Sequence, residues 1–361
     1  MKYRNIEDRL PAEAVAAGRA AFPENPAEAR ALTDLGNAER LIDRFGTVLR
    51  YCPPRGCWYV WDGSCWNEDK TGEVVRLAKQ SVRAIADEAE RADPERQKAI
   101  LKHARQSEQA ARLEAAIKLA TTERGIPVMP DELDADPWAL NVANGTIDLR
   151  TGKLRPHCPK DLLTKICPVA YDPSARSAVW DAFLKAATKG DKELEAYLQR
   201  MTGRALQGEV VEKAFWFFYG PPDGMKSTFI NAISKTLGSY AAPAAFTTWL
   251  VQTHIGGNRG DLVALRGARL VTSVEVRRDA RFDEATLKAV TGGDALKAAA
   301  KYEKEIELRP TFALWLAGND APRIRDDDAG AWSRVRRVPF CNPLPAEQRD
   351  PSMGEKLAAP E

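Results

Sequence analysis

The sequence has little cysteine, little histidine and no clear excess of charge of one sign. Six cysteines are scattered through 361 residues without a CxxC pair, and only three histidines are present. This pattern argues against a structural zinc site, which takes closely spaced cysteine and histidine ligands, and isolated cysteines fit reduced thiols. The formal net charge is +2, so any surface that binds nucleic acid must be local.

Long hydrophobic runs are also missing. No apolar stretch approaches the roughly 18 residues that a membrane helix needs, and residues 1–30 are rich in Ala, Pro and charge, unlike a signal peptide. We therefore expect no membrane partner and a cytoplasmic location. The composition, 44% hydrophobic and 29% charged, is typical of a globular protein, and the length fits two or three domains.

The first half of the chain predicts helices around a small aromatic hairpin. Residues 33–50 carry an amphipathic helix pattern, and 73–120 carry helical periodicity with a restart at Asp93-Pro94. Between them, "WYVWDGSCW" (58–66) places a turn signal between aromatic strands. Its aromatic rings either form the core of the hairpin or stack on nucleic-acid bases, and the sequence leaves both interpretations open.

The second half predicts an α/β fold. From about residue 212 to 342, buried-type apolar strands alternate with amphipathic helices, which is typical of a parallel sheet covered by helices. The segment "FWFFYGPPDGMKSTFINAISKTLG" (215–238) reads as strand, phosphate loop and helix. We expect this loop to bind nucleotide through Gly220, Pro221, Pro222, Asp223, Gly224, Met225, Lys226, Ser227 and Thr228.

Two residues of the loop carry specific chemistry. Lys226 is placed to meet the β- and γ-phosphates of ATP, and the Ser227 hydroxyl is placed to bind Mg²⁺. The usual pattern GxxxxGK[ST] has glycine directly before the lysine, where this chain has Met225. Either the loop follows a slightly different path or nucleotide binds more weakly.

Polar residues after two later strands complete a candidate ATPase site. Glu275 follows an apolar run and is a candidate for supporting Mg²⁺ or polarising the attacking water, and Asn319 follows the next run and is a candidate for orienting that water. Arg334, Arg336 and Arg337 follow this strand, and an arginine among them is a candidate for stabilising transition-state charge at a neighbouring subunit's nucleotide. The alternative for this arginine cluster is surface pairing with the acidic run 326–328.

The order of these motifs resembles the superfamily 3 helicases of phages and plasmids, the group found as the C-terminal part of primase-helicases. The resemblance spans about residues 130–342 and rests on "LNVANGTIDLRTGKLRPHCPKDLLTKICPVAYDPSA", "GPPDGMKST", "DLVALRGARLVTSVEV", "LKAVTGGD", "FALWLAGNDAP" and "AWSRVRRVPF". It implies an AAA+-type ATPase with a central parallel sheet after a mostly helical, hairpin-bearing region. The implied domains are an N-terminal segment (1–48), a helicase-associated domain (49–206), an ATPase domain (207–345) and the start of a truncated C-terminal region (346–361).

The resemblance also implies roles and partners. Lys226 and Ser227 match the Walker A pair, Glu275 the Walker B acid and second Mg²⁺ ligand, Asn319 sensor 1, and Arg334 the arginine finger. The family implies a homo-oligomeric, hexameric ring that hydrolyses ATP and moves along single-stranded and replication-fork DNA. Such a protein works in the cytoplasm of a bacterial host, encoded by a phage or mobile element, with a separate primase or polymerase.

The DNA contacts implied by the resemblance come from a hairpin that precedes sensor 1. In that stretch lie Lys297, Lys301 and Lys304, which would contact DNA phosphates in the channel of the ring. The alternative is a charged helix face shared with neighbouring glutamates. Because Met225 departs from the family pattern, a degenerate nucleotide-binding module that binds or loads DNA with weak ATP turnover is the alternative to a helicase. A small-molecule kinase is a third class.

Overall fold

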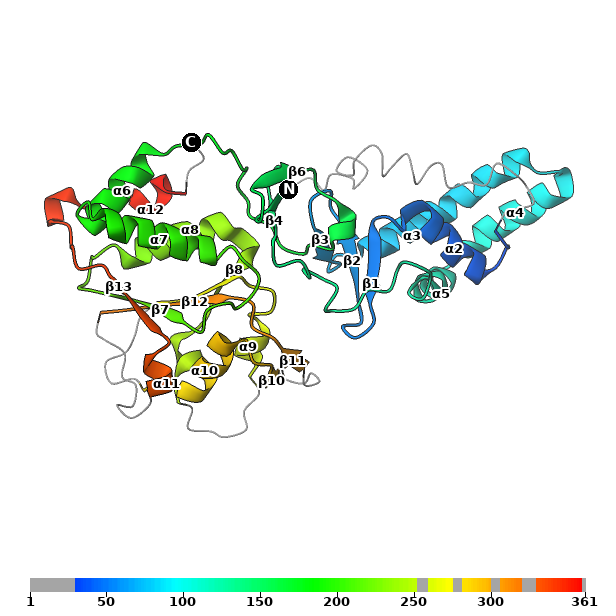
Figure 1. The fold of residues 1–361 in the computed structure, drawn as a ribbon. Helices are drawn as coiled ribbons and strands as arrows, with labels where there is room; N and C mark the ends of the chain where they lie inside the picture. Colours follow the sequence, from blue (N-terminus) through cyan, green and yellow to red (C-terminus); the bar gives the residue numbers. More distant parts are fainter. Residues whose placement is uncertain (1–29, 252–258, 275–280, 300–305, 320–328, 359–361) are drawn as a thin grey trace. The chain divides into compact units, whose positions relative to one another are not determined.

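The computed structural model describes residues 30–251, 259–274, 281–299, 306–319 and 329–358 (Figure 1). The chain divides into two compact units. Unit 1 holds the residues up to Ala135 and returns for His157–Thr164, and unit 2 holds Asp136–Pro156 and everything from Lys165 on. The domain boundaries expected at 48, 206 and 345 stay predictions. No helix in the described part of the chain is long and apolar enough to cross a membrane.

Unit 1 packs helices against a three-stranded antiparallel sheet of order β1-β2-β3. Its elements are α2 (Asp34–Phe45), β1 (Leu49–Cys52), β2 (Cys57–Trp61), β3 (Trp66–Glu68), α3 (Glu73–Arg83), the 3₁₀ helix η3 (Ala84–Arg91), α4 (Pro94–Ser107), α5 (Ala110–Ala120) and η4 (Pro159–Asp161).

The start of α4 confirms the helix restart read from the sequence. Asp93 accepts hydrogen bonds from the backbone N–H groups of Glu95 and Arg96, and Pro94 is the first helical residue. In the preceding segment, Val74 and Leu77 are buried, whereas Val75 is 38% exposed.

The tryptophans of the hairpin belong to the core of unit 1. Trp58, Trp61 and Trp66 are 9%, 3% and 1% exposed, and the Trp66 indole N–H donates to the Pro159 carbonyl at 2.8 Å. Rings this deeply buried have no face to offer a base. The core interpretation of the hairpin is therefore confirmed, and base stacking by these rings is not.

Unit 2 contains a five-stranded parallel sheet with strand order β13-β7-β12-β9-β8. Its elements are β4 (Ala139–Val142), β5 (Gly145–Asp148), β6 (Lys153–Arg155), α6 (Ala178–Thr188), α7 (Lys192–Arg204), β7 (Phe215–Tyr219), α8 (Lys226–Leu237), η5 (Gly238–Tyr240), β8 (Ala241–Pro243), η6 (Phe246–Trp249), α9 (Gly260–Val263), β9 (Leu270–Val274), α10 (Glu284–Gly292), β10 (Leu296–Ala298), β11 (Ile306–Leu308), β12 (Ala313–Gly318), α11 (Ala329–Trp332), β13 (Val335–Pro339), η7 (Ala346–Gln348) and α12 (Met353–Lys356). The α/β class with a central parallel sheet, expected from the sequence, is confirmed.

Helices cover both faces of this sheet (Figure 1). Alternate residues of β7 point to opposite faces: Trp216 and Phe218 join the core under α6, α7 and α8, whereas Phe215 and Phe217 join the core with α10 and α11. Burial on both faces explains why β7 reads as the unbroken apolar run FWFFY.

Candidate nucleotide site

The phosphate loop joins β7 to α8 at the carboxyl edge of the sheet. β7 ends at Tyr219, and α8 begins at Lys226 without an acidic residue in its first turn. The free N–H groups and the positive end of the helix dipole at such a start favour anions. The strand, loop and helix expected from the sequence are all present.

Met225 adopts the backbone conformation that glycine takes at low cost. Its φ and ψ are 66° and 7°, in the left-handed region, and it directly precedes α8. The loop therefore keeps a turn that suits glycine, with methionine in its place. A left-handed residue with a side chain costs roughly 1–2 kcal/mol, and the Met225 side chain packs against the core under α6, α7 and α8, which offsets part of that cost.

Lys226 points back into its own loop. Its ammonium group donates to the carbonyl oxygens of Gly220 and Pro221, both at 2.8 Å, and the residue is buried. Burial lowers the pKa of Lys226, and the nearby Cys341 and Asp223 act in the opposite direction. The positive charge of Lys226 is thus held in the centre of the loop.

Parallel strands bring Asn319 beside the loop. β12 lies between β7 and β9, and its last residue, Gly318, pairs with Tyr219. Asn319 follows β12 as Gly220 follows β7, and it is exposed. On its other side β12 pairs with β9 up to Val274. Glu275, the expected Walker B acid, lies outside the described residues.

A magnesium ion fits the donors that the described part of the loop offers. Ser227 is the second residue of α8, and its side chain is exposed beside buried Lys226. A hydroxyl here is an oxygen ligand of the kind that Mg²⁺ takes together with phosphate oxygens. When bound with ATP, the ion would supply charge neutralisation at the phosphates.

Arg334 lies at the amino end of the parallel strands, whereas the phosphate loop lies at their carboxyl end. Arg334 precedes β13, whose five residues lead toward the phosphate loop and span roughly 16 Å. Its guanidinium donates to the Lys288 carbonyl at 2.7 Å and to the Thr291 hydroxyl at 2.8 Å, at the end of α10. The structure thus brings together the "LKAVTGGD" and "AWSRVRRVPF" segments, which the sequence showed only as separate motifs.

The first of the expected DNA-contacting lysines lies on a short antiparallel pair of strands. Lys297 is exposed on β10 and pairs in register with Glu307 of β11. Lys301 and Lys304 lie outside the described residues. The described strands show that this stretch begins as a β-hairpin rather than as a charged helix face.

One contact to the loop was missed by the sequence reasoning. Arg349, in the segment after β13, forms an ion pair with Asp223 of the loop, with Arg349 Nη1 2.8 Å from Asp223 Oδ2. The two residues are 126 positions apart in the printed numbering, and no local pattern links them.

Comparisons with known proteins agree on the kind of protein. A family described as "D5 N terminal like" matches residues 38–189. Curated relatives include "Putative helicase L207/L206" of Acanthamoeba polyphaga mimivirus, 24% identical over 84% of this chain and 34% of the relative. Another is "Putative helicase 022R" of Frog virus 3, 24% identical over 59% of this chain and 29% of the relative. The chain thus spans about a third of the length of these relatives.

Solved structures share the fold. The apo structure of the NrS-1 C-terminal region in its A form aligns with a TM-score of 0.51 and 11% identity, covering 90% of this chain and 66% of that one. A second apo structure of the same region, residues 305–718, gives a TM-score of 0.50 and 13% identity with the same coverage.

The family match covers the region before the five-stranded sheet, and the mimivirus relative extends the similarity over most of the chain. The parallel sheet and the strand, loop and helix around Lys226 are those that the sequence predicted. The chain is thus similar to the D5 N-terminal-like family over residues 38–189 and to viral putative helicases over most of its length.

Proposed function

We propose that this chain is the ATP-driven motor of a DNA helicase, active as a ring, in which Mg-ATP hydrolysis moves the protein along single-stranded DNA at a replication fork. The observation that carries the proposal is the loop at the end of β7, with Lys226 held at its centre and Asn319 directly after the neighbouring strand β12. The similarity to viral putative helicases supports the same activity.

In this proposal each residue has one task. Lys226 binds the β- and γ-phosphates, Ser227 and Glu275 hold Mg²⁺, Asn319 orients the attacking water, and Arg334 acts on the ATP of the neighbouring subunit. The DNA partner is recognised by the phosphate charge, with Lys297, Lys301 and Lys304 in the channel. A hexameric ring, a separate primase or polymerase and a bacterial host are part of the same proposal.

A second function is favoured by the loop itself. Met225 holds a left-handed conformation, and Pro221-Pro222 remove two N–H donors from the loop. These features favour a nucleotide-binding or DNA-loading module with weak turnover. Since the position of Lys226 is kept, both functions require nucleotide binding and differ in the rate of hydrolysis.

The deciding experiment is the Mg²⁺-dependent ATPase rate with and without single-stranded DNA. Lys226→Ala removes the charge at the centre of the loop, and Lys235→Ala, an exposed position later in the same helix, is the matched control. We expect DNA to stimulate the wild-type rate, Lys226→Ala to lose at least about 100-fold, and Lys235→Ala to behave as wild type. Nucleotide binding without hydrolysis above the Lys226→Ala level would favour the loading module.

A further inference from the structure

The phosphate loop contains a negative charge where it is proposed to receive a polyanion. Asp223 lies three positions before Lys226, has a positive φ of 59° and is 56% exposed at its side chain. A carboxylate in a phosphate-binding loop repels the phosphates that the loop binds. The loop therefore needs a compensating positive charge besides Lys226.

Arg349 supplies such a charge from another part of the chain. Its Nη1 atom is 2.8 Å from Asp223 Oδ2, and its Nε donates to the Leu344 carbonyl at 3.0 Å, which fixes the direction of the guanidinium. The acidic neighbour Asp350 is paired with Lys356 and Ser352 instead. The Arg349 charge is thus directed to the loop.

The segment that carries Arg349 is anchored on both sides of the loop. At its start, the Phe340 carbonyl oxygen lies so close to the loop that a Cβ at Gly220 or Gly224 would be 2.1 or 2.4 Å from it. Further on, the Asn342 amide donates to the Ala187 carbonyl at 3.0 Å. At its end, Met353 and Leu357 of the α12 region pack against the core that contains α8. This anchoring holds Arg349 at the loop.

We propose that Arg349 is a positioning residue of the nucleotide site, which neutralises Asp223 so that the loop accepts the triphosphate of ATP. The inference rests on the proposed function, because it assigns a role within the same nucleotide site. It makes residues 340–357 a part of that site. The charge effect grows with the number of phosphates, so it favours ATP over ADP.

The test is the dissociation constant of the full chain for Mg-ADP and for a non-hydrolysable Mg-ATP analogue at low salt. We expect Arg349→Ala to weaken binding of the ATP analogue about fivefold and binding of ADP by less. We expect Asp223→Asn to strengthen binding of the ATP analogue. The double variant, which removes both charges of the pair, should bind close to wild type. Asparagine tolerates a positive φ, so Asp223→Asn preserves the backbone of the loop.

Arg150→Ala is the matched control. Arg150 also pairs with an aspartate, Asp136, is 53% exposed, and lies in the same unit near β5. Equal affinities of Arg349→Ala and Arg150→Ala for the ATP analogue would overturn the inference. A double variant that binds the analogue as weakly as Arg349→Ala would also overturn it, because that result indicates a structural role for Arg349. If the wild type binds neither nucleotide, the proposed function itself fails. If the wild type binds nucleotide and Arg349→Ala binds with the same affinity, only the inference fails.

Discussion

Met225 shows how a phosphate loop keeps its path when its usual glycine is replaced. The backbone at this position is left-handed, with φ 66°, so the sequence departs from the motif while the geometry does not. A side chain in this left-handed conformation carries local backbone strain.

This strain predicts an unusual order of stability for two substitutions. Met225→Gly and Met225→Ala both remove the packed side chain, but only alanine keeps a Cβ in the left-handed region. We expect the glycine variant to be more stable than the alanine variant by about 1 kcal/mol, measured as the free energy of unfolding in a denaturant titration.

The same pair of substitutions at Lys235, near the end of α8, provides the control. At Lys235, inside the helix and exposed, alanine should be more stable than glycine by about 0.5–1 kcal/mol. If the alanine variant is also more stable than the glycine variant at Met225, that result would contradict a left-handed backbone at Met225.

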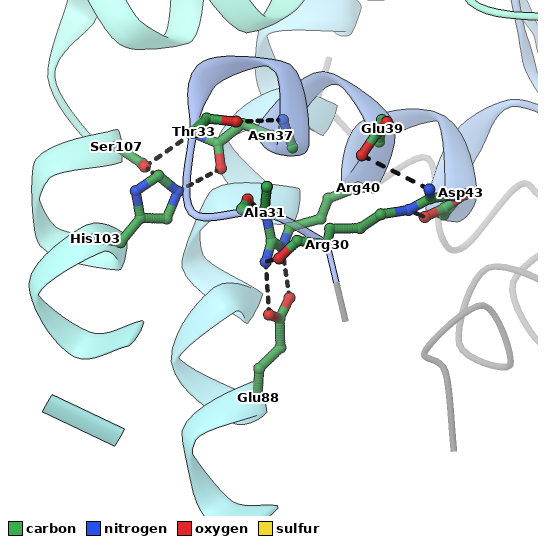
Figure 2. Close-up of polar contacts among 11 residues, drawn as sticks. Arg30, Ala31, Thr33, Asn37, Glu39, Arg40, Asp43, Glu88, His103 and Ser107 are labelled. Atoms are coloured by element: carbon green, nitrogen blue, oxygen red, sulfur yellow. Dashed lines mark hydrogen bonds and ion pairs between the residues drawn. The ribbon is translucent and has the colours of Figure 1, made fainter. Parts of the chain in front are cut away.

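At the scale of elements, a buried polar network joins α2 to α4 in unit 1 (Figure 2). Asn37 of α2 lies with its side-chain oxygen 2.8 Å from His103 Nε2 and donates its amide N–H to Ser107 Oγ at 2.8 Å. All three residues are at most 5% exposed. Because the amide oxygen of Asn37 can only accept, His103 Nε2 must carry the proton in this arrangement.

His103 links this network to pH. Burial lowers its pKa, as do the positive charges of Arg40 and Arg112, while Asp34 and Glu88 act in the opposite direction. Since the native pKa lies below that of the unfolded chain, the unfolded state binds more protons at acidic pH. Stability contributed by this network is present at neutral pH and is lost as pH falls below the unfolded value of about 6.5.

We therefore predict that the α4 amide groups lose hydrogen-exchange protection between pH 7 and pH 5, after correction for intrinsic rates. The free energy of opening derived from this exchange should change by no more than about 1.4 kcal/mol per pH unit, the slope for uptake of one proton. His103→Gln should flatten it, because glutamine keeps a donor but does not titrate in this range. His157→Gln, outside the network, is the control, and an equal slope in wild type and His103→Gln would exclude His103 as the source.

The elements that the sequence predicted are those with short-range signals. The run FWFFY, the Asp93-Pro94 restart and the loop-to-helix step at Lys226 follow from periodicity and capping within a few residues. The contacts of Arg334 with Thr291 and of Arg349 with Asp223 join segments that are distant in sequence. Such contacts depend on strand order and on the path of the segment after β13, which no local pattern encodes.

At the scale of the whole molecule, the position of Arg334 bears on assembly. It lies at the edge of the sheet opposite to the phosphate loop, separated from it by the length of β13. If Arg334 acts on ATP, it therefore acts on the ATP of another subunit. A ring supplies that arrangement, since each subunit then presents its loop to one neighbour and its Arg334 to the other.

This arrangement predicts that two inactive variants restore activity when mixed. Lys226→Ala subunits keep Arg334, and Arg334→Ala subunits keep the loop, so a site formed between them has both groups. In a random equal mixture about a quarter of the interfaces are of this kind, and we expect about a quarter of the wild-type ATPase rate. The measurement is the DNA-stimulated rate of subunits mixed before assembly, with each variant alone as the baseline.

Arg334→Lys separates the role in the neighbouring site from the contacts within the subunit. Lysine can keep a hydrogen bond to the Lys288 carbonyl or the Thr291 hydroxyl, which Arg334 contacts through one nitrogen, but it lacks the fork geometry of a guanidinium. We expect Arg334→Lys to remain folded, to be inactive alone and to recover with Lys226→Ala subunits. Differently tagged subunits verify that mixed assemblies form. If these assemblies stay inactive, Arg334 serves its own subunit. The ring would then need another source of positive charge at the ATP of the neighbouring subunit.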